Sequence, residues 1–292
     1  MRPAVILMAY GSPERPEDIR PYLEDIREGR PVSDAAVEEL AERYRRIGGR
    51  SPLGDVTEAQ RAAVERELGF PVFVGMKHWR PRILEAVDRA LAIGADTIAG
   101  LVLAPHYSRL SVEGYRERLL EAIGGRADVR FVESWHTHEP YIEVLADRVN
   151  GAGAHVVFTA HSLPARILDE GDPYRDQLLE TSQLVAERAN LDSWSFAFQS
   201  ESSTSEPWLG PDILTELDAL AARGLENVLV CPIGFVSDHL EILWDLDVEA
   251  RARAAELGLR LHRVQSLNDD PAFVRGIAEL LRQTVSVPSS AR

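Results

Sequence analysis

Short apolar runs recur along the whole chain, and a charged stretch with helical spacing follows most of them. Strands are predicted at 4–9, 72–74, 97–104 and 129–132 in the first half, and at 155–159, 194–198, 228–231 and 260–264 in the second; most of these segments are apolar, whereas 260–264 (RLHRV) is mixed. Unbroken apolar runs of this length are typical of parallel strands buried on both faces. The stretches between them predict helices at 16–29, 34–47, 82–91, 112–123, 141–149, 175–189, 211–222 and 271–283.

This regular alternation predicts right-handed βαβ units and parallel sheets, which is an α/β fold. The halves also resemble each other weakly, because residues 8–13 (MAYGSP) align with 159–164 (TAHSLP) at the end of each half's first run. We therefore predict two doubly wound, Rossmann-like lobes related by pseudo-twofold symmetry. Their expected limits are 1–145 and 146–270, with a helix at 271–285 packing back on the first lobe.

Composition and charge argue against two classes of partner, nucleic acids and anionic membranes. The chain has 292 residues, of which 45% are hydrophobic and 27% charged, and a formal net charge of −15. A nucleic-acid partner is disfavoured because phosphate binding needs a positive surface. Docking on anionic lipid is disfavoured for the same reason.

Three further features favour a cytoplasmic location. Cys231 is the one cysteine, so no intramolecular disulfide can form, which is compatible with a reducing compartment. The apolar part of residues 1–13 is too short for a secretory signal. In addition, no apolar run reaches the ~18–20 residues that a membrane span needs.

An acidic stripe follows the strand predicted at 228–231. We expect a helix to begin near Ser237 or Asp238, since either side chain could cap its first N–H groups. In that helix Glu241, Asp245 and Glu249 would share one face. Such a row could conduct a cation, but a solvated acidic face at a helix start would have the same spacing.

Several aromatic and imidazole side chains come directly after predicted strands. Ligands of doubly wound folds bind beyond the carboxyl ends of the strands, which places Tyr10, His106, His161 and the turn at 232–241 around one cleft. His161 could accept a proton or bind a metal there, or it could be a loop histidine bonded to backbone. His106 and His78 have a weaker context, and His239 is expected to cap or pack.

A cluster of arginines stands out against the negative net charge. Residues 43–50 contain four arginines and no acid. Guanidinium groups bind carboxylates in a bidentate manner, so several of them suit a ligand with several carboxylates. The alternative is a basic helix end that complements the helix dipole. Tyr44 and Ser51, within and next to the cluster, favour a carboxylate-binding rim.

Six ordered motifs together resemble those of ferrochelatases. The two signatures are 160–164 (AHSLP) and 237–241 (SDHLE). The other matching stretches are 46–53 (RIGGRSPL), 75–78 (GMKH), 103–108 (LAPHYS) and 207–211 (PWLGP). The resemblance extends from Val5 to about Phe273, and it implies a two-lobed enzyme that inserts Fe²⁺, its substrate, into a porphyrin.

The resemblance also implies roles for individual residues. His161 and Glu241 would face each other on one side of the macrocycle as catalytic and metal-binding groups, and Asp245 and Glu249 would lead the metal inward. Tyr10 would lie on the opposite face and, in the coproporphyrin branch of the family, ligate the product iron. Further residues would line the macrocycle or hold its propionates: Arg27, Arg43, Tyr44, Ser51 and Tyr115. Lys77 matches a site lysine of unspecified role.

Two departures from parts of the family bear on the substrate. A single cysteine excludes the iron–sulfur cluster that some members carry, and the stretch 13–30, an apolar lip in membrane-associated members, is charged here. A charged lip and an arginine rim favour coproporphyrin III, with coprohaem as product, over protoporphyrin IX. We expect a monomer that contacts other haem-pathway enzymes only transiently.

Two other functions remain open at this point. One is a non-catalytic, two-lobed protein that binds haem or metal, and the other is a relative that inserts cobalt or nickel into a sirohydrochlorin-type ring.

Overall fold

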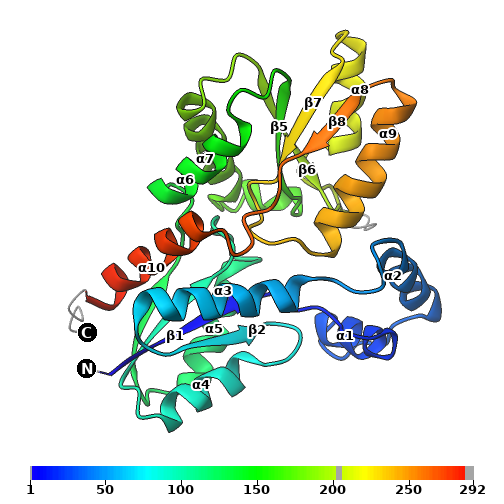
Figure 1. The fold of residues 1–292 in the computed structure, drawn as a ribbon. Helices are drawn as coiled ribbons and strands as arrows, with labels where there is room; N and C mark the ends of the chain where they lie inside the picture. Colours follow the sequence, from blue (N-terminus) through cyan, green and yellow to red (C-terminus); the bar gives the residue numbers. More distant parts are fainter. Residues whose placement is uncertain (1, 202–205, 287–292) are drawn as a thin grey trace.

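The computed structural model describes residues 2–201 and 206–286, which form two α/β lobes (Figure 1). Each lobe is built on a four-stranded parallel sheet. The first contains β1 (Pro3–Ala9), β2 (Val72–Met76), β3 (Thr97–Val102) and β4 (Asp128–Val132), in the order β2-β1-β3-β4. The second contains β5 (His155–His161), β6 (Trp194–Gln199), β7 (Asn227–Cys231) and β8 (Arg260–Arg263), in the order β6-β5-β7-β8. The repeated order confirms the predicted fold.

The central strands are buried on both faces, as their unbroken apolar runs predicted. In β1, Val5 pairs with Val72 on one side and Ala99 on the other, and residues 4–8 have no exposed surface. In β5, Val156 lies between Trp194 and Leu229 in the same way. This arrangement aligns the carboxyl ends of the strands at one edge of each sheet.

Helices cover both faces of each sheet. Their bounds are α1 (Ile19–Ile26), α2 (Asp34–Arg46), α3 (Leu53–Leu68), α4 (Ile83–Ala92), α5 (Val112–Ile123), α6 (Glu139–Val149), α7 (Tyr174–Arg188), α8 (Ile213–Ala222), α9 (Arg251–Glu256) and α10 (Pro271–Ser286). Two 3₁₀ helices, η1 (Pro16–Asp18) and η2 (Ala165–Leu168), and a π-helix, η3 (Ile242–Ala250), complete the set. In the described part of the chain, no helix is long and apolar enough to cross a membrane.

One long helix, α3, was not predicted. Its buried positions are Leu53, Thr57, Gln60, Val64 and Leu68, which do have helical spacing. Two of these five side chains are polar, so the apolar pattern is interrupted at the centre of the buried face.

The acidic helix was predicted to begin too early. Helical structure begins at Leu240 and continues as the π-helix η3. Ser237 and Asp238 do not cap it, because other partners hold their side chains: Gln60 bonds to Ser237, and Ser266 and Asn268 bond to Asp238.

The last helix crosses back from the second lobe to the first. Figure 1 shows α10 beside α3, and it also packs against α6, β3 and β4. Apolar residues of β1, β5 and α10 belong to one continuous core, including Val5, Phe158 and Ile277. The limit predicted at residue 145 falls inside α6. The limits of the two domains remain a prediction.

Candidate active site

A cavity of about 310 Å³ lies where the strand ends of both sheets meet. The first sheet contributes Tyr10, after β1, and Lys77, after β2. The second contributes His161, the last residue of β5, and the segment 234–241 that follows β7. The structure therefore brings together six of the predicted site residues: Tyr10, Ser51, Lys77, Tyr115, His161 and Glu241.

His161 and Glu241 form the polar centre of the cavity wall. The Nε2 atom of His161 lies 3.5 Å from a carboxylate oxygen of Glu241, and Nδ1 donates to the backbone carbonyl of Ser162. His239 reaches the second carboxylate oxygen, also at 3.5 Å. The side chains of His161 and Glu241 are 30% and 38% exposed, so both remain accessible from the cavity.

His161 and Glu241 each stabilise the charged form of the other. Burial acts to lower the pKa of His161, but attraction to the Glu241 carboxylate outweighs it and raises that pKa to about 9. Burial likewise acts to raise the pKa of Glu241, and the imidazolium outweighs it, so this pKa lies well below its usual range. At neutral pH the pair therefore consists of an imidazolium and a carboxylate.

The acidic row extends from this pair toward solvent. Asp245 is buried, and its carboxylate accepts hydrogen bonds from Ser200 and, at 3.4 Å, from Gln199. Burial and the charge of Glu241 raise the pKa of Asp245 to about 6. Glu249 is exposed. Across residues 2–201 and 206–286, no three His, Cys, Asp or Glu side chains form a preassembled metal site. The metal-binding role of the row remains a prediction.

Tyr10 belongs to the other lobe, where it packs against a histidine that is itself held by polar contacts. Its ring packs on His78 with 4.6 Å between centroids, and His78 Nδ1 bonds to Asp25 at 2.9 Å. Arg82 also pairs with Asp25, at 2.8 Å. Burial lowers the pKa of His78 to about 4, because the pairing with Asp25 does not compensate for it. His78 is therefore a neutral packing partner of Tyr10 at neutral pH.

Lys77 and Tyr115 lie together on the cavity wall. The Lys77 ammonium lies 4.9 Å from the centroid of the Tyr115 ring, where a cation–π attraction operates. Burial, followed by repulsion from Arg118, lowers the pKa of Lys77 to about 8. Lys77 is thus a cation at neutral pH that can lose its proton more readily than a surface lysine.

The remaining predicted residues lie outside the cavity lining formed by the described residues: Arg27, Arg43, Tyr44, Asp245 and Glu249. Arg27 is exposed at the end of α1. Arg43 pairs with Glu39 at 2.9 Å, and its guanidinium lies 5.7 Å from the centroid of Trp244 on η3. The arginines of α2 therefore contact the helix that begins at the cavity, and Tyr44 beside them is buried.

Sequence reasoning missed some of the cavity wall. Tyr174 lines it and donates a hydrogen bond to the carbonyl of His161 at 3.0 Å. Gly234 lets the turn after β7 approach β5, since a Cβ there would lie 2.5 Å from Cβ of Ala160. No periodicity signals these two residues. His106 was considered from its strand-end position; it lines the cavity and bonds to Thr181 at 2.9 Å.

Comparison with known proteins identifies the family. The ferrochelatase family model matches residues 2–285. Ferrochelatase of Herpetosiphon aurantiacus is 42% identical over 97% of this chain and 98% of its own length. Coproporphyrin III ferrochelatase of Halalkalibacterium halodurans is 39% identical over 97% of each chain.

Among solved structures, SirB from Bacillus subtilis with Fe³⁺ is 13% identical, with a TM-score of 0.65 over 98% of this chain and 96% of that one. At this identity the likeness concerns the fold alone. The sequence comparisons carry the assignment, and the chain belongs to the ferrochelatase family.

Proposed function

We propose that this ferrochelatase inserts Fe²⁺ into coproporphyrin III and that His161 and Glu241 carry the reaction. The observation that carries the proposal is the cavity itself, where an imidazolium–carboxylate pair from one lobe and Tyr10 from the other border the same space. Relatives named coproporphyrin III ferrochelatase support the choice of substrate. The arginines of α2 also support it, because they can hold propionates that protoporphyrin IX lacks.

The proposed mechanism requires two protons to leave the pyrrole nitrogens as Fe²⁺ binds. His161 can accept a proton only after it has lost the one that its raised pKa retains. Fe²⁺ bound at Glu241 would offset the negative charge that raises this pKa, so His161 would release its proton to solvent and could then pass the two pyrrole protons to solvent one after the other. Binding of the remote propionates would offset strain in a distorted macrocycle.

The substrate proposal is tested by anaerobic Fe²⁺ turnover with coproporphyrin III and protoporphyrin IX side by side. We expect a higher kcat/KM for coproporphyrin III. A higher kcat/KM for protoporphyrin IX would overturn the choice of substrate and leave the family assignment intact.

The arginines of α2 give a second test of the substrate. Arg43→Ala should weaken coproporphyrin III binding by about one to two decades, because a charge-assisted hydrogen bond contributes roughly 1.5–3 kcal/mol. The effect on protoporphyrin IX should be smaller, and high salt should weaken binding to wild type more than to the variant. Fluorescence titration at two ionic strengths measures both effects. Unchanged coproporphyrin affinity would make these arginines a basic helix end.

The acidic row predicts a selective effect on the metal. Asp245→Asn together with Glu249→Gln should raise the KM for Fe²⁺ more than the KM for the porphyrin, because the row is proposed to supply the cation. In the wild type, the KM for Fe²⁺ should also rise as the pH falls through about 6, where Asp245 gains a proton. Steady-state kinetics with each substrate varied in turn checks this. Equal changes in both KM values would indicate a solvated face.

A further inference from the structure

The segment between β7 and η3 carries site residues without regular structure of its own. Residues 235–239 are neither helix nor strand, yet Phe235, His239 and the following Glu241 line the cavity. Fixing a chain in one conformation costs entropy, so its polar groups need partners that stabilise that conformation. The partners of this segment therefore determine where Glu241 points.

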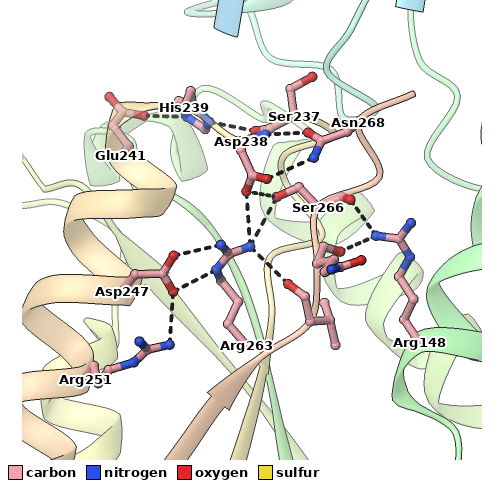
Figure 2. A network of polar contacts seen from close by, with 12 residues as sticks. Arg148, Ser237, Asp238, His239, Glu241, Asp247, Arg251, Arg263, Ser266 and Asn268 are labelled. Atoms are coloured by element: carbon pink, nitrogen blue, oxygen red, sulfur yellow. Dashed lines mark hydrogen bonds and ion pairs between the residues drawn. The ribbon is translucent and has the colours of Figure 1, made fainter. Parts of the chain in front are cut away.

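Asn268 holds the segment at two positions. Its backbone N–H donates to the carbonyl of Val236 at 2.7 Å. Its side-chain oxygen accepts from the backbone N–H of Asp238 at 2.8 Å, while its amide donates to the Asp238 carboxylate at 2.9 Å (Figure 2). The φ of Asn268 is 46°, a left-handed conformation that asparagine adopts more readily than most residues. Asn268 thus provides both the left-handed backbone turn and the side-chain amide that binds Asp238.

Gln60 reaches the same segment from the other lobe. It lies on α3 and is 1% exposed. Its Nε2 donates to the carbonyl of Asn268 at 2.8 Å and to Oγ of Ser237 at 3.1 Å. This amide accounts for the polar position at the centre of the buried face of α3, and it connects the N-terminal lobe to the segment that precedes Glu241.

Besides Asn268, two further residues contact the carboxylate of Asp238. Ser266 donates to it at 2.7 Å, and Arg263 approaches to 3.2 Å while also pairing with Asp247 of η3 at 2.7 Å (Figure 2). Burial acts to raise the pKa of Asp238, but these hydrogen bonds and charges hold it below its usual value. Asp238 is therefore an anionic anchor that connects the segment to the acidic helix.

We infer that Asn268 and Gln60 are positioning residues of the ferrochelatase reaction. Together they clamp the segment 236–238 between the two lobes and so hold Glu241 opposite His161. The inference rests on the roles proposed for His161 and Glu241. Neither Asn268 nor Gln60 is among the residues that line the cavity, so each acts through the segment rather than on the porphyrin.

Asn268→Asp is the sharpest single change, because it sets a second carboxylate against Asp238. We expect kcat to fall at least tenfold while the KM for the porphyrin changes less than about threefold, since only the position of Glu241 is disturbed. Anaerobic steady-state kinetics measures this, and thermal unfolding shows that the variant is folded at the assay temperature. A folded variant with wild-type kcat would overturn the role of Asn268.

Exchanging the two side chains separates positioning from general loosening of the fold. In the double variant Asp238→Asn/Asn268→Asp, one amide again faces one carboxylate. Its kcat should match that of Asp238→Asn alone, whereas independent effects would multiply. Rescue of this kind supports the clamp, and a double variant that carries the product of both losses overturns it.

Gln60→Leu tests the contribution of the other lobe, with Thr57→Val as its matched control. Thr57 is buried on the same helix, but among the described residues its hydroxyl bonds only to the carbonyl of Leu53 within α3, at 2.7 Å. Gln60→Leu should lower kcat at least fivefold more than Thr57→Val does, a difference of about 1 kcal/mol in activation free energy. Equal losses would overturn the inference.

His161→Ala and Glu241→Gln, measured in the same series, distinguish failure of the positioning inference from failure of the proposed function. If they retain turnover, the proposed function of the site fails. If they lose turnover while the Asn268 and Gln60 variants keep it, only the positioning inference fails.

Discussion

Replacing His161 by alanine should lower kcat at least ~100-fold, the lower end of what loss of a general base costs. His161 lines the cavity with its Nε2 atom 3.5 Å from Glu241, and alanine leaves the pyrrole protons without this acceptor. Because the propionates would bind elsewhere, the KM for coproporphyrin III should change much less than kcat. Anaerobic turnover at saturating Fe²⁺ provides the measurement.

His262→Ala is the matched control for this experiment. His262 is an exposed histidine on β8, and its loss should leave kcat at the wild-type value. Wild-type turnover by a folded His161→Ala variant would remove His161 from the mechanism, and equal losses in both variants would point to damage unrelated to the site.

Replacing Glu241 by glutamine should have a comparable effect on kcat, again ~100-fold or more, and should also change the protonation of its partner. The carboxylate outweighs burial and raises the pKa of His161 to about 9. Without it, burial is opposed only by the Ser162 carbonyl and the charge of Asp245, so the pKa of His161 should fall and more of the imidazole should be neutral at neutral pH. Histidine titration by NMR measures this shift directly.

The stability lost in Glu241→Gln should also depend on pH. The raised pKa of His161 contributes stability that is fully present below its unfolded value of ~6.5 and is lost as the pH rises through about 9. The depressed pKa of Glu241 contributes stability that is present above its unfolded value of ~4.3 and is lost in acid. The stability difference between wild type and Glu241→Gln should therefore be largest between pH ~5 and 6.5 and shrink on either side.

Glu256→Gln is the control for surface charge, since Glu256 is an exposed acid that pairs with Arg253 at 2.8 Å. It should show no comparable window. A flat stability difference between wild type and Glu241→Gln across this range would contradict the charge-separated pair.

The sheets were predictable from sequence because their central strands are apolar runs, as in β1 and β7, and these runs alternate regularly with helical segments along the chain. Helix α3 was missed for a physical reason that concerns function. Thr57 and Gln60 occupy its buried face, and Gln60 is polar because it bonds to the segment before Glu241. The pattern was broken at a position where a polar contact between lobes replaces apolar packing.

The start of the acidic helix was placed wrongly because local capping rules consider only nearby partners. Asp238 would make a good cap, but Ser266 and Asn268, about thirty residues further along, bind its carboxylate instead. The contacts of Arg43 with Trp244 and of Tyr174 with His161 likewise join distant segments. Topology alone was enough to place the strand ends around one cleft. The partners of the side chains in the cleft could not be predicted, because they belong to segments that are distant in the sequence.

The packing of α10 has a consequence for how the chain is made. Phe273, Ile277 and Leu281 of α10 belong to the same core as Val5 and Val64 of the first lobe. During synthesis, the first lobe leaves the ribosome before these residues exist, so the face of α3 that α10 later covers stays open until α10 has been made and can dock. A ribosome-bound chain stalled after residue 270 should therefore expose this apolar face and bind chaperones, and a chain extended far enough for α10 to leave the exit tunnel should release them.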